Sequence, residues 1–240
     1  MVKMIRDPSG RFAERPYFAS GELDRACEVI VRRFHRKRGE DDRVNLTTDE
    51  ISILIEGEDA DLDSSVDLTP YGHDVEGVSI FHPNGSAEVK ISSRLADNTR
   101  MENRLRTTLA HEFGHLHFHR HLWAMKFATQ DLFASSKVTD NAAICKRDQI
   151  LNARQADWME WQAGYISGAI LMPVSAITSI VAKYRADQNL MGSISPISSH
   201  ALQLSEEVRA AFQVSEDAAS VRMQVLGLLE GTGSATTFFT

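Results

Sequence analysis

The sequence predicts an α+β protein in which helices pack on a small β-sheet, and three periodic patterns lead to this prediction. Between residues 98 and 122 apolar residues recur at three- and four-residue steps, which is typical of an amphipathic helix. Residues 75–81 and 87–92 alternate between apolar and polar types on either side of a turn sequence, which indicates a β-hairpin. Residues 201–212 and 215–226 predict a pair of short C-terminal helices.

Composition and length place the chain among soluble globular proteins, with either one large domain or a core with appendages. The net charge of -7 over 240 residues gives no electrostatic attraction for nucleic acid or an acidic membrane. The longest uncharged run, residues 161–182, contains Pro173 and several polar residues, so it does not predict a membrane span. The first 18 residues lack the apolar segment of a secretory signal. We therefore expect a cytoplasmic protein that neither enters a membrane nor binds nucleic acid directly.

The chain has two cysteines, Cys27 and Cys145, and neither belongs to a CxxC pair. They make no disulfide framework. Cys27 is interpreted as a small apolar residue on a helix. A redox or metal role for either cysteine is the less favoured alternative.

The N-terminal region predicts a loose arm over residues 1–19 and then two helices. Ser20 is a suitable N-cap for the first helix. One face of that helix carries Leu23, Ala26, Cys27, Ile30 and Phe34. Its basic end, residues 32–38, is interpreted as a solvated helix C-terminus in preference to a nucleic-acid contact. Thr48 then predicts the cap of a short helix, and residues 56–67 predict an acidic loop.

The predicted hairpin has two interpretations, and the sequence leaves both open. Its strands, 75–81 and 87–92, lead directly into the helix of residues 98–122. One strand could lie along a cleft and pair with an extended peptide, as edge strands do. Alternatively, the hairpin only covers one side of the core.

The helix of residues 98–122 carries the sequence His111-Glu112-Phe113-Gly114-His115. On a helix His111 and His115 lie one turn apart, so their imidazoles can converge on one tetrahedral Zn²⁺. Glu112 can take the proton of a zinc-bound water. Gly114 is unfavourable inside a helix, which indicates that something packs closely there. The alternative is a helix with one satisfied histidine and a solvated glutamate.

Three further histidines, His117, His119 and His121, follow this sequence. His119 is one turn beyond His115 and could line the cleft, whereas the other two are expected at the surface. Residues 122–156 predict one short helix and a loop, which either covers the cleft or is a plain insertion.

A catalytic zinc site with two histidines needs a third protein ligand and an open position. Glu160 is the single charge in the apolar helical segment 158–173, and a buried carboxylate there would need a cation. The alternative is an exposed Glu160 that stabilises the helix N-terminus. The residues alone leave these two readings open.

Three segments, in order, resemble the ImmA/IrrE family of metallopeptidases. Residues 104–119, RLRTTLAHEFGHLHFH, resemble its RxxxTxAHELGHxxxH segment, and residues 160–173, EWQAGYISGAILMP, are similar to its ExxANxFAxxLLMP segment. Residues 204–227 resemble its LAxxFxVSxxAxxxRLxxLG ending. The resemblance implies a zincin-like core, with His111, His115 and Glu160 as zinc ligands and Glu112 as general base. It also implies an intracellular protease that cleaves helix-turn-helix repressors of mobile elements or stress responses.

The chain departs from the family pattern at two places. Gly164 stands where the family commonly has Asn, one turn after Glu160. An amide at that position could orient a zinc histidine, so this support is absent or comes from elsewhere. The stretch between His115 and Glu160 is also longer than is usual in the family, and substrate choice could differ accordingly.

The C-terminal region predicts helices that pack on the core. Pro173 ends one helix and can start another at Val174. A helix-turn-helix over 201–226 would invite a DNA-binding interpretation, but its charges are net acidic, so packing or protein docking is preferred. We expect a zincin-like metallopeptidase domain over 20–186, with 122–156 as an insertion, a C-terminal helical region over 187–230 and a disordered tail over 231–240.

The predicted function is zinc-dependent hydrolysis of peptide bonds, with Glu112 passing the proton of the zinc-bound water to the leaving amine. The reaction also needs an oxyanion stabiliser, and the candidates are Tyr165, His119 and Arg104. The expected partner is a protein substrate. One alternative is a regulatory binding protein that uses the zincin scaffold without cleaving anything. Another is a DNA-binding regulator, which the charge balance disfavours.

Overall fold

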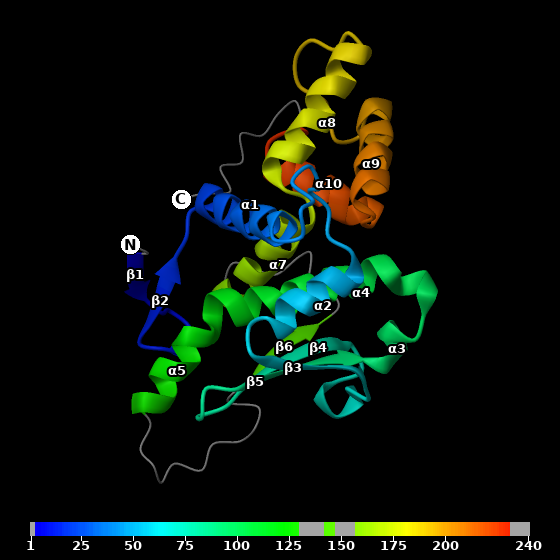
Figure 1. Cartoon of the computed structure of the whole chain (residues 1–240). Coiled ribbons are helices and arrows are strands. Elements are labelled where there is room, and N and C mark those ends of the chain that lie inside the picture. Colours follow the sequence, from blue (N-terminus) through cyan, green and yellow to red (C-terminus); the bar gives the residue numbers. More distant parts are fainter. Residues whose placement is uncertain (1–2, 130–141, 147–156, 231–240) are drawn as a thin grey trace.

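The fold is a four-stranded sheet with helices on one face, and a helix that carries the predicted metal site lies between them (Figure 1). The computed structural model describes residues 3–129, 142–146 and 157–230. The strands are β1 (Lys3–Arg6), β2 (Glu14–Tyr17), β3 (Ala60–Val66), β4 (Val75–Phe81), β5 (Ala87–Ser92) and β6 (Ala142–Lys146).

The helices fall into two groups along the chain. The first group is α1 (Ser20–Arg36), α2 (Thr48–Glu56), α3 (Ser93–Ala96), α4 (Glu102–Gly114) and α5 (Arg120–Thr129). The second group is α7 (Trp158–Leu171), α8 (Val174–Asp187), α9 (Ser199–Phe212) and α10 (Glu216–Val225). Short helical turns are η1 (Thr69–Tyr71), η2 (Thr99–Met101) and the π-helical η3 (His115–His119). The α+β class is confirmed.

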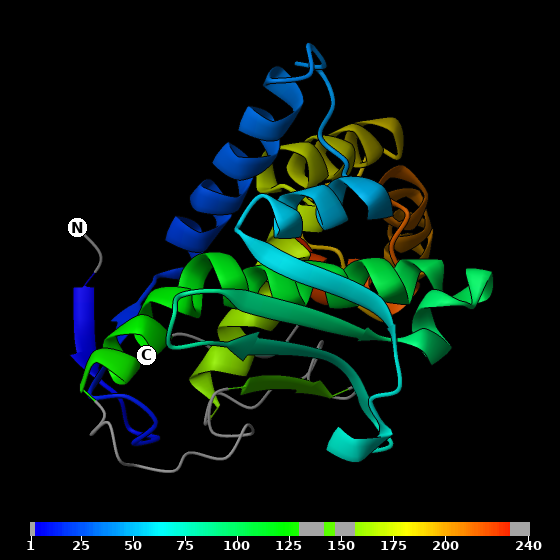
Figure 2. The same ribbon diagram turned by 60° about the horizontal axis from the view of Figure 1, so that its bottom comes forward.

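The main sheet has the strand order β3-β5-β4-β6 (Figure 2). β4 and β5 form the predicted antiparallel hairpin, β3 runs parallel to β5, and β6 runs antiparallel to β4 on its other side. Two strands of this sheet were not predicted, because β3 lies in the expected acidic loop and β6 in the expected insertion. Each is a strand only through its pairing with a distant segment, which local periodicity does not reveal.

The N-terminal segment is not the loose arm that the sequence predicted. β1 and β2 form an antiparallel ribbon. The loop between them is pinned to α7, since the Trp158 indole donates a 2.8 Å hydrogen bond to a buried carboxylate, Asp7. Asp7 also accepts a 3.0 Å hydrogen bond from the backbone N–H of Phe12. This tertiary contact, which local sequence cannot indicate, orders the ribbon.

The first two helices follow the predicted faces but start one residue early. In α1 the predicted face is buried or half-buried, and Cys27 is fully covered. Its N-cap is Ala19 rather than Ser20. In α2 the N-cap is Thr47 rather than Thr48, because Thr47 accepts a hydrogen bond from Glu50.

α4 packs between the sheet and α7, with α2 alongside it (Figure 1). Gly114 allows the close approach to α7, since a Cβ atom there would lie 3.3 Å from the Cα of Ala163 and from Cγ2 of Ile166. The close packing expected at Gly114 is therefore confirmed. α1 covers the other side of α7.

The C-terminal helices share the main core. Leu204, Val208 and Phe212 of α9 and Met223 of α10 are all buried in it. Arg222 is also buried and donates a 2.7 Å hydrogen bond to Asp24 of α1. Ser215 caps α10 as predicted. The predicted packing role of these helices therefore agrees with their place in the structure.

Within the described residues, no single helix has the length and apolar composition needed to cross a membrane, although α7 and α8 pass that test as a pair bent by 60°. The predicted tail over 231–240 and much of the predicted insertion lie outside the described residues.

Candidate metal centre

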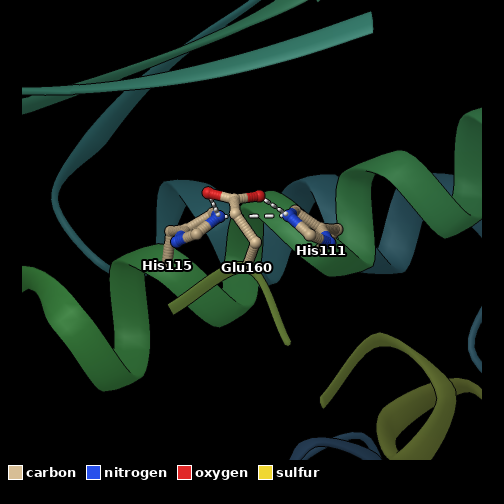
Figure 3. A group of neighbouring side chains, drawn as sticks. All are labelled: His111, His115 and Glu160. Carbon is tan, nitrogen blue, oxygen red and sulfur yellow. Dashed lines mark hydrogen bonds and ion pairs between the residues drawn. The ribbon is translucent and has the colours of Figure 1, made fainter. Parts of the chain in front are cut away.

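Two histidines of one helix and a glutamate of another converge at the packed face of α4 and α7 (Figure 3). The Nε2 atoms of His111 and His115 are 3.0 Å apart. The Glu160 carboxylate spans them, with Oε2 3.1 Å from His111 Nε2 and Oε1 3.4 Å from His115 Nε2. The four-residue spacing of His111 and His115 brings these two side chains together on one helix. The packing of α7 on α4 brings Glu160 to them.

These distances suit a tetrahedral metal ion. Ligands about 2.0–2.1 Å from Zn²⁺ at tetrahedral angles are about 3.3 Å from one another. The three separations of 3.0, 3.1 and 3.4 Å lie close to that value. Two imidazoles and one carboxylate are also a donor set found at catalytic zinc sites. The residues of the centre therefore fit a zinc ion with one position left over.

A chain of hydrogen bonds behind His115 fixes which of its nitrogens is free. The Gln162 amide donates to the carbonyl of Pro16 at 3.3 Å, so its Oε1 is left to accept from His119 Nε2 at 3.0 Å. The other nitrogen of a neutral His119, Nδ1, then accepts from Nδ1 of His115 at 3.2 Å. This assignment leaves the lone pair of His115 Nε2 directed at the metal position.

The candidate base Glu112 lies against β4. Ser79 donates a 2.5 Å hydrogen bond to its Oε2. Its Oε1 has no hydrogen-bond partner among the described residues. Gly77 lies directly beneath the carboxylate, because a Cβ atom at that position would lie 2.9 Å from Cδ of Glu112 and closer still to Oε1. The strand therefore leaves room for this carboxylate and orients it.

Cys145 of β6 joins the centre from the same side as β4. Its sulfur, a ring nitrogen of His111 and a carboxylate oxygen of Glu112 lie within 4.8 Å of one another. All the side chains of the centre are buried, with exposed fractions from 0% for Glu112 to 3% for Glu160.

Burial and close contact shift the pKa values of these groups in different directions. Burial raises the pKa of the Glu112 carboxyl, although both histidines oppose the shift. Burial also disfavours the ionised Glu160, but the neighbouring His115 and His111 outweigh it and lower the pKa of Glu160 far below its usual range. The pKa of His115 is raised, because the Glu160 charge outweighs the effect of burial. The space between Glu160 and the histidines therefore favours a cation.

Burial favours the neutral form of two neighbouring groups, His119 and Cys145. Burial, reinforced by His115, lowers the pKa of His119 well below its usual value, so His119 is neutral as the hydrogen-bond assignment requires. Burial, followed by the charge of Glu112, raises the pKa of the Cys145 thiol well above its usual value.

The three candidate oxyanion stabilisers lie elsewhere. His119 is buried behind His115 and does not line a cleft. Tyr165 donates a 2.8 Å hydrogen bond to Asp24. Arg104 donates a 2.8 Å hydrogen bond to Glu76, nearly two turns before His111. His117 and His121 are exposed, as predicted.

Four residues of the centre were not predicted from sequence: Ser79, Gly77, Gln162 and Cys145. Gln162 had the clearest signal, since it lies two residues after Glu160 and is a polar residue in an apolar helix. Gly77 and Ser79 lie in the predicted strand 75–81, for which a place along the cleft was one of two open interpretations, whereas no signal indicated that Cys145 lies on a strand beside Glu112.

A second cluster, His35, Glu40 and Glu50, also has metal-ligand chemistry. Arg43 lies between its carboxylates, 2.6 Å from Glu40 and 2.9 Å from Glu50. The guanidinium therefore already provides the cation of this cluster.

The sequence matches one known family. The family model Peptidase_M78, described as the IrrE N-terminal-like domain, covers residues 94–224, which is more than half of the chain. The match includes α4 and α7 and hence all three ligands and Glu112, whereas β4 lies before it. No curated protein matches the chain.

Proposed function

The chain belongs to the IrrE N-terminal-like (Peptidase_M78) family, and from this premise we propose that it is a zinc-dependent endopeptidase. The observation that carries the proposal is the convergence of His111, His115 and Glu160, with Glu112 buried next to them. A structural zinc site would need no such carboxylate beside it, whereas peptide hydrolysis needs a base.

In the proposed mechanism His111, His115 and Glu160 would hold the zinc ion. When bound, zinc lowers the pKa of water and polarises a carbonyl group. Glu112 accepts the proton of the attacking water and delivers it to the leaving amine. Ser79 holds the Glu112 carboxylate by one oxygen, which leaves the other free for this proton transfer.

The proposed substrate is a cytoplasmic protein, and the resemblance to the ImmA/IrrE family favours a helix-turn-helix repressor. The chain itself is expected to bind no DNA, since the charges of its C-terminal helices are net acidic. Gly164 has no side chain that could orient a histidine of the centre. His119 and Gln162 orient His115 by hydrogen bonds instead. This support favours a working metal site over an inert scaffold.

The test compares wild type with Glu112→Gln and Glu160→Ala. Each protein is assayed for bound zinc and then incubated with a repressor encoded next to its gene and with an unfolded general substrate. We expect one equivalent of zinc in wild type and Glu112→Gln, and less in Glu160→Ala. Cleavage should be about 100-fold slower or more in Glu112→Gln, the usual contribution of a general base.

Two results would contradict the proposal in different ways. Full zinc content in Glu160→Ala would show that Glu160 is not a ligand. Equal cleavage by wild type and Glu112→Gln would mean that the centre does not perform the hydrolysis. If every metal-loaded form of the protein leaves both substrates whole, the alternative of a non-proteolytic zincin scaffold is favoured.

A further inference from the structure

The N-terminal ribbon, which consists of β1, β2 and the loop between them, contacts the metal centre from behind His115. The ribbon lies outside the family match of residues 94–224. Within it Pro16 of β2 pairs with Met4 of β1, and the Pro16 carbonyl accepts the hydrogen bond of Gln162. The ribbon therefore supplies the last acceptor of the hydrogen-bond chain that begins at His115.

The Pro16 carbonyl determines which way the Gln162 amide points. An amide side chain has a donor end and an acceptor end, and a half-turn exchanges them. Because the NH₂ group donates to Pro16, the oxygen faces Nε2 of His119, which then carries the proton. A reversed amide would donate to Nε2 instead and leave the proton of His119 on Nδ1.

The reversed arrangement would oppose metal binding by His115. A neutral His115 that binds metal through Nε2 carries its proton on Nδ1 and needs an acceptor there. In the observed arrangement that acceptor is Nδ1 of His119, at 3.2 Å. After reversal two N–H groups would face each other across this distance. The orientation of Gln162 is therefore coupled to the metal-binding form of His115.

Asp7 fastens the ribbon to α7. Its buried carboxylate accepts hydrogen bonds from the Trp158 indole at 2.8 Å and from the backbone N–H groups of Ser9 at 2.9 Å and Phe12 at 3.0 Å. Hydrogen bonds to an ionised group are roughly twice as strong as neutral ones. Loss of this carboxylate would also leave the buried indole N–H without its acceptor, at an additional cost.

The Trp158 ring also contacts the histidine that supports the centre. The ring centroids of Trp158 and His119 are 5.6 Å apart, and the planes meet edge to face at 85°. Asp7 is thus connected to His119 in two ways. One connection passes through the ribbon to the Pro16 carbonyl and Gln162, and the other passes through the indole ring.

We infer that Asp7 is a positioning residue of the metal centre, which holds His119 in the orientation and tautomer that leave Nε2 of His115 free for zinc. This inference rests on the proposed zinc-dependent function. Asp7 acts through Trp158 and the Pro16 carbonyl. Its loss should weaken zinc binding although all three candidate ligands are retained.

The test measures the zinc affinity of the full-length protein by competition with a chelator. Outer partners of metal ligands contribute about 10- to 100-fold to affinity, and Asp7 lies beyond them, so we expect about tenfold weaker binding in Asp7→Ala. Trp158→Phe keeps an aromatic ring and removes the indole N–H, so it should weaken binding as well, but by less.

Each variant has a matched control, which should bind zinc like wild type. Asp67→Ala is the control for Asp7→Ala, because Asp67 also accepts from a backbone N–H two residues further on but lies beside η1. Trp161→Phe is the control for Trp158→Phe, since Trp161 lies on the same helix and its ring packs against Tyr165.

A second measurement separates positioning from a general loss of structure. Long-range proton–nitrogen NMR spectra of the zinc-loaded proteins identify the nitrogen of each histidine that carries a proton. We expect the proton of His119 on Nε2 in wild type and both controls. In Asp7→Ala and Trp158→Phe we expect part of the population to carry it on Nδ1.

Unchanged zinc affinity in Asp7→Ala would overturn the inference. If Asp7→Ala does not fold, equal affinities of Trp158→Phe and Trp161→Phe would overturn it instead. Weaker zinc binding with the His119 proton still on Nε2 would also overturn it, because the loss would then come from destabilisation alone. Weaker binding with the shifted proton, in a protein whose wild type leaves the repressor whole, would support the positioning role and refute the peptidase function.

Discussion

The metal centre has a helical side and a strand side, which are built in different ways. The helical side comprises the three candidate ligands on α4, η3 and α7, with His119 and Gln162 behind them. Its hydrogen bonds run without a break from His115 through His119 and Gln162 to the Pro16 carbonyl. The strand side comprises Glu112, Gly77, Ser79 and Cys145, and one oxygen of Glu112 there has no partner among the described residues.

This difference indicates that the helical side serves metal binding and the strand side serves proton transfer. Ligands must keep one tautomer and one orientation, so the hydrogen-bond chain behind His115 suits the helical side, although His111 Nδ1 has no hydrogen-bond partner among the described residues. A general base must accept and release a proton. A carboxylate with one oxygen bonded to Ser79 and the other without a hydrogen-bond partner among the described residues suits this task on the strand side. Variants of the helical side should therefore change metal affinity, and variants of the strand side should change turnover with the metal retained.

The largest expected effect comes from Gly77→Ala on the strand side. The new methyl group would overlap Glu112 and displace its carboxylate. A misplacement of about 1 Å lowers kcat by about 100-fold. Zinc content should stay at one equivalent, because no ligand lies against Gly77. Gly21→Ala is the control, since a Cβ atom at Gly21 meets nothing within 4 Å. Loss of zinc together with activity would erase the distinction between the two sides.

Gln162→Leu should have the next largest effect, on the helical side. It removes the acceptor for His119 and hence the bond that fixes the tautomer of His115. Loss of such an outer partner weakens metal binding by about 10- to 100-fold. Competition with a chelator measures the affinity. Gln224→Leu is the control, because Gln224 is exposed and bonds only to Ser220. Unchanged affinity with a normal melting temperature would refute the role of the relay.

Ser79→Ala should have the smallest effect and sharpens the comparison. It removes the 2.5 Å hydrogen bond to Glu112 but no contact of the three ligands. One hydrogen bond to a carboxylate corresponds to roughly tenfold in kcat. Ser167→Ala is the matched control, since Ser167 is a buried serine of α7 that donates to Thr107 instead. Steady-state kinetics at saturating zinc distinguishes the two serines, and equal losses in both would mean that Ser79 acts only through packing.

The sequence by itself determined the two histidines of the helical side, but neither Gln162 nor the place of His119 behind them. The spacing of His111 and His115 fixes their convergence, because a helix brings residues four apart onto one face. The resemblance implied Glu160, and the structure places its carboxylate between the two histidines. The hairpin β4–β5 was also predicted, since its alternation and its turn are local features. These features depend on short stretches of chain and are therefore visible in them.

Only the tertiary structure decided the strand side. β3 and β6 are strands because distant partners accept their backbone groups. For Cys145 the sequence offered only a redox or metal role as the less favoured alternative, and its place beside Glu112 follows from its pairing with Gly77 across 68 positions of sequence. The N-terminal ribbon became part of the centre only through the Pro16 carbonyl. Such contacts depend on how distant elements pack against one another, and the periodicity of the sequence indicates only local structure.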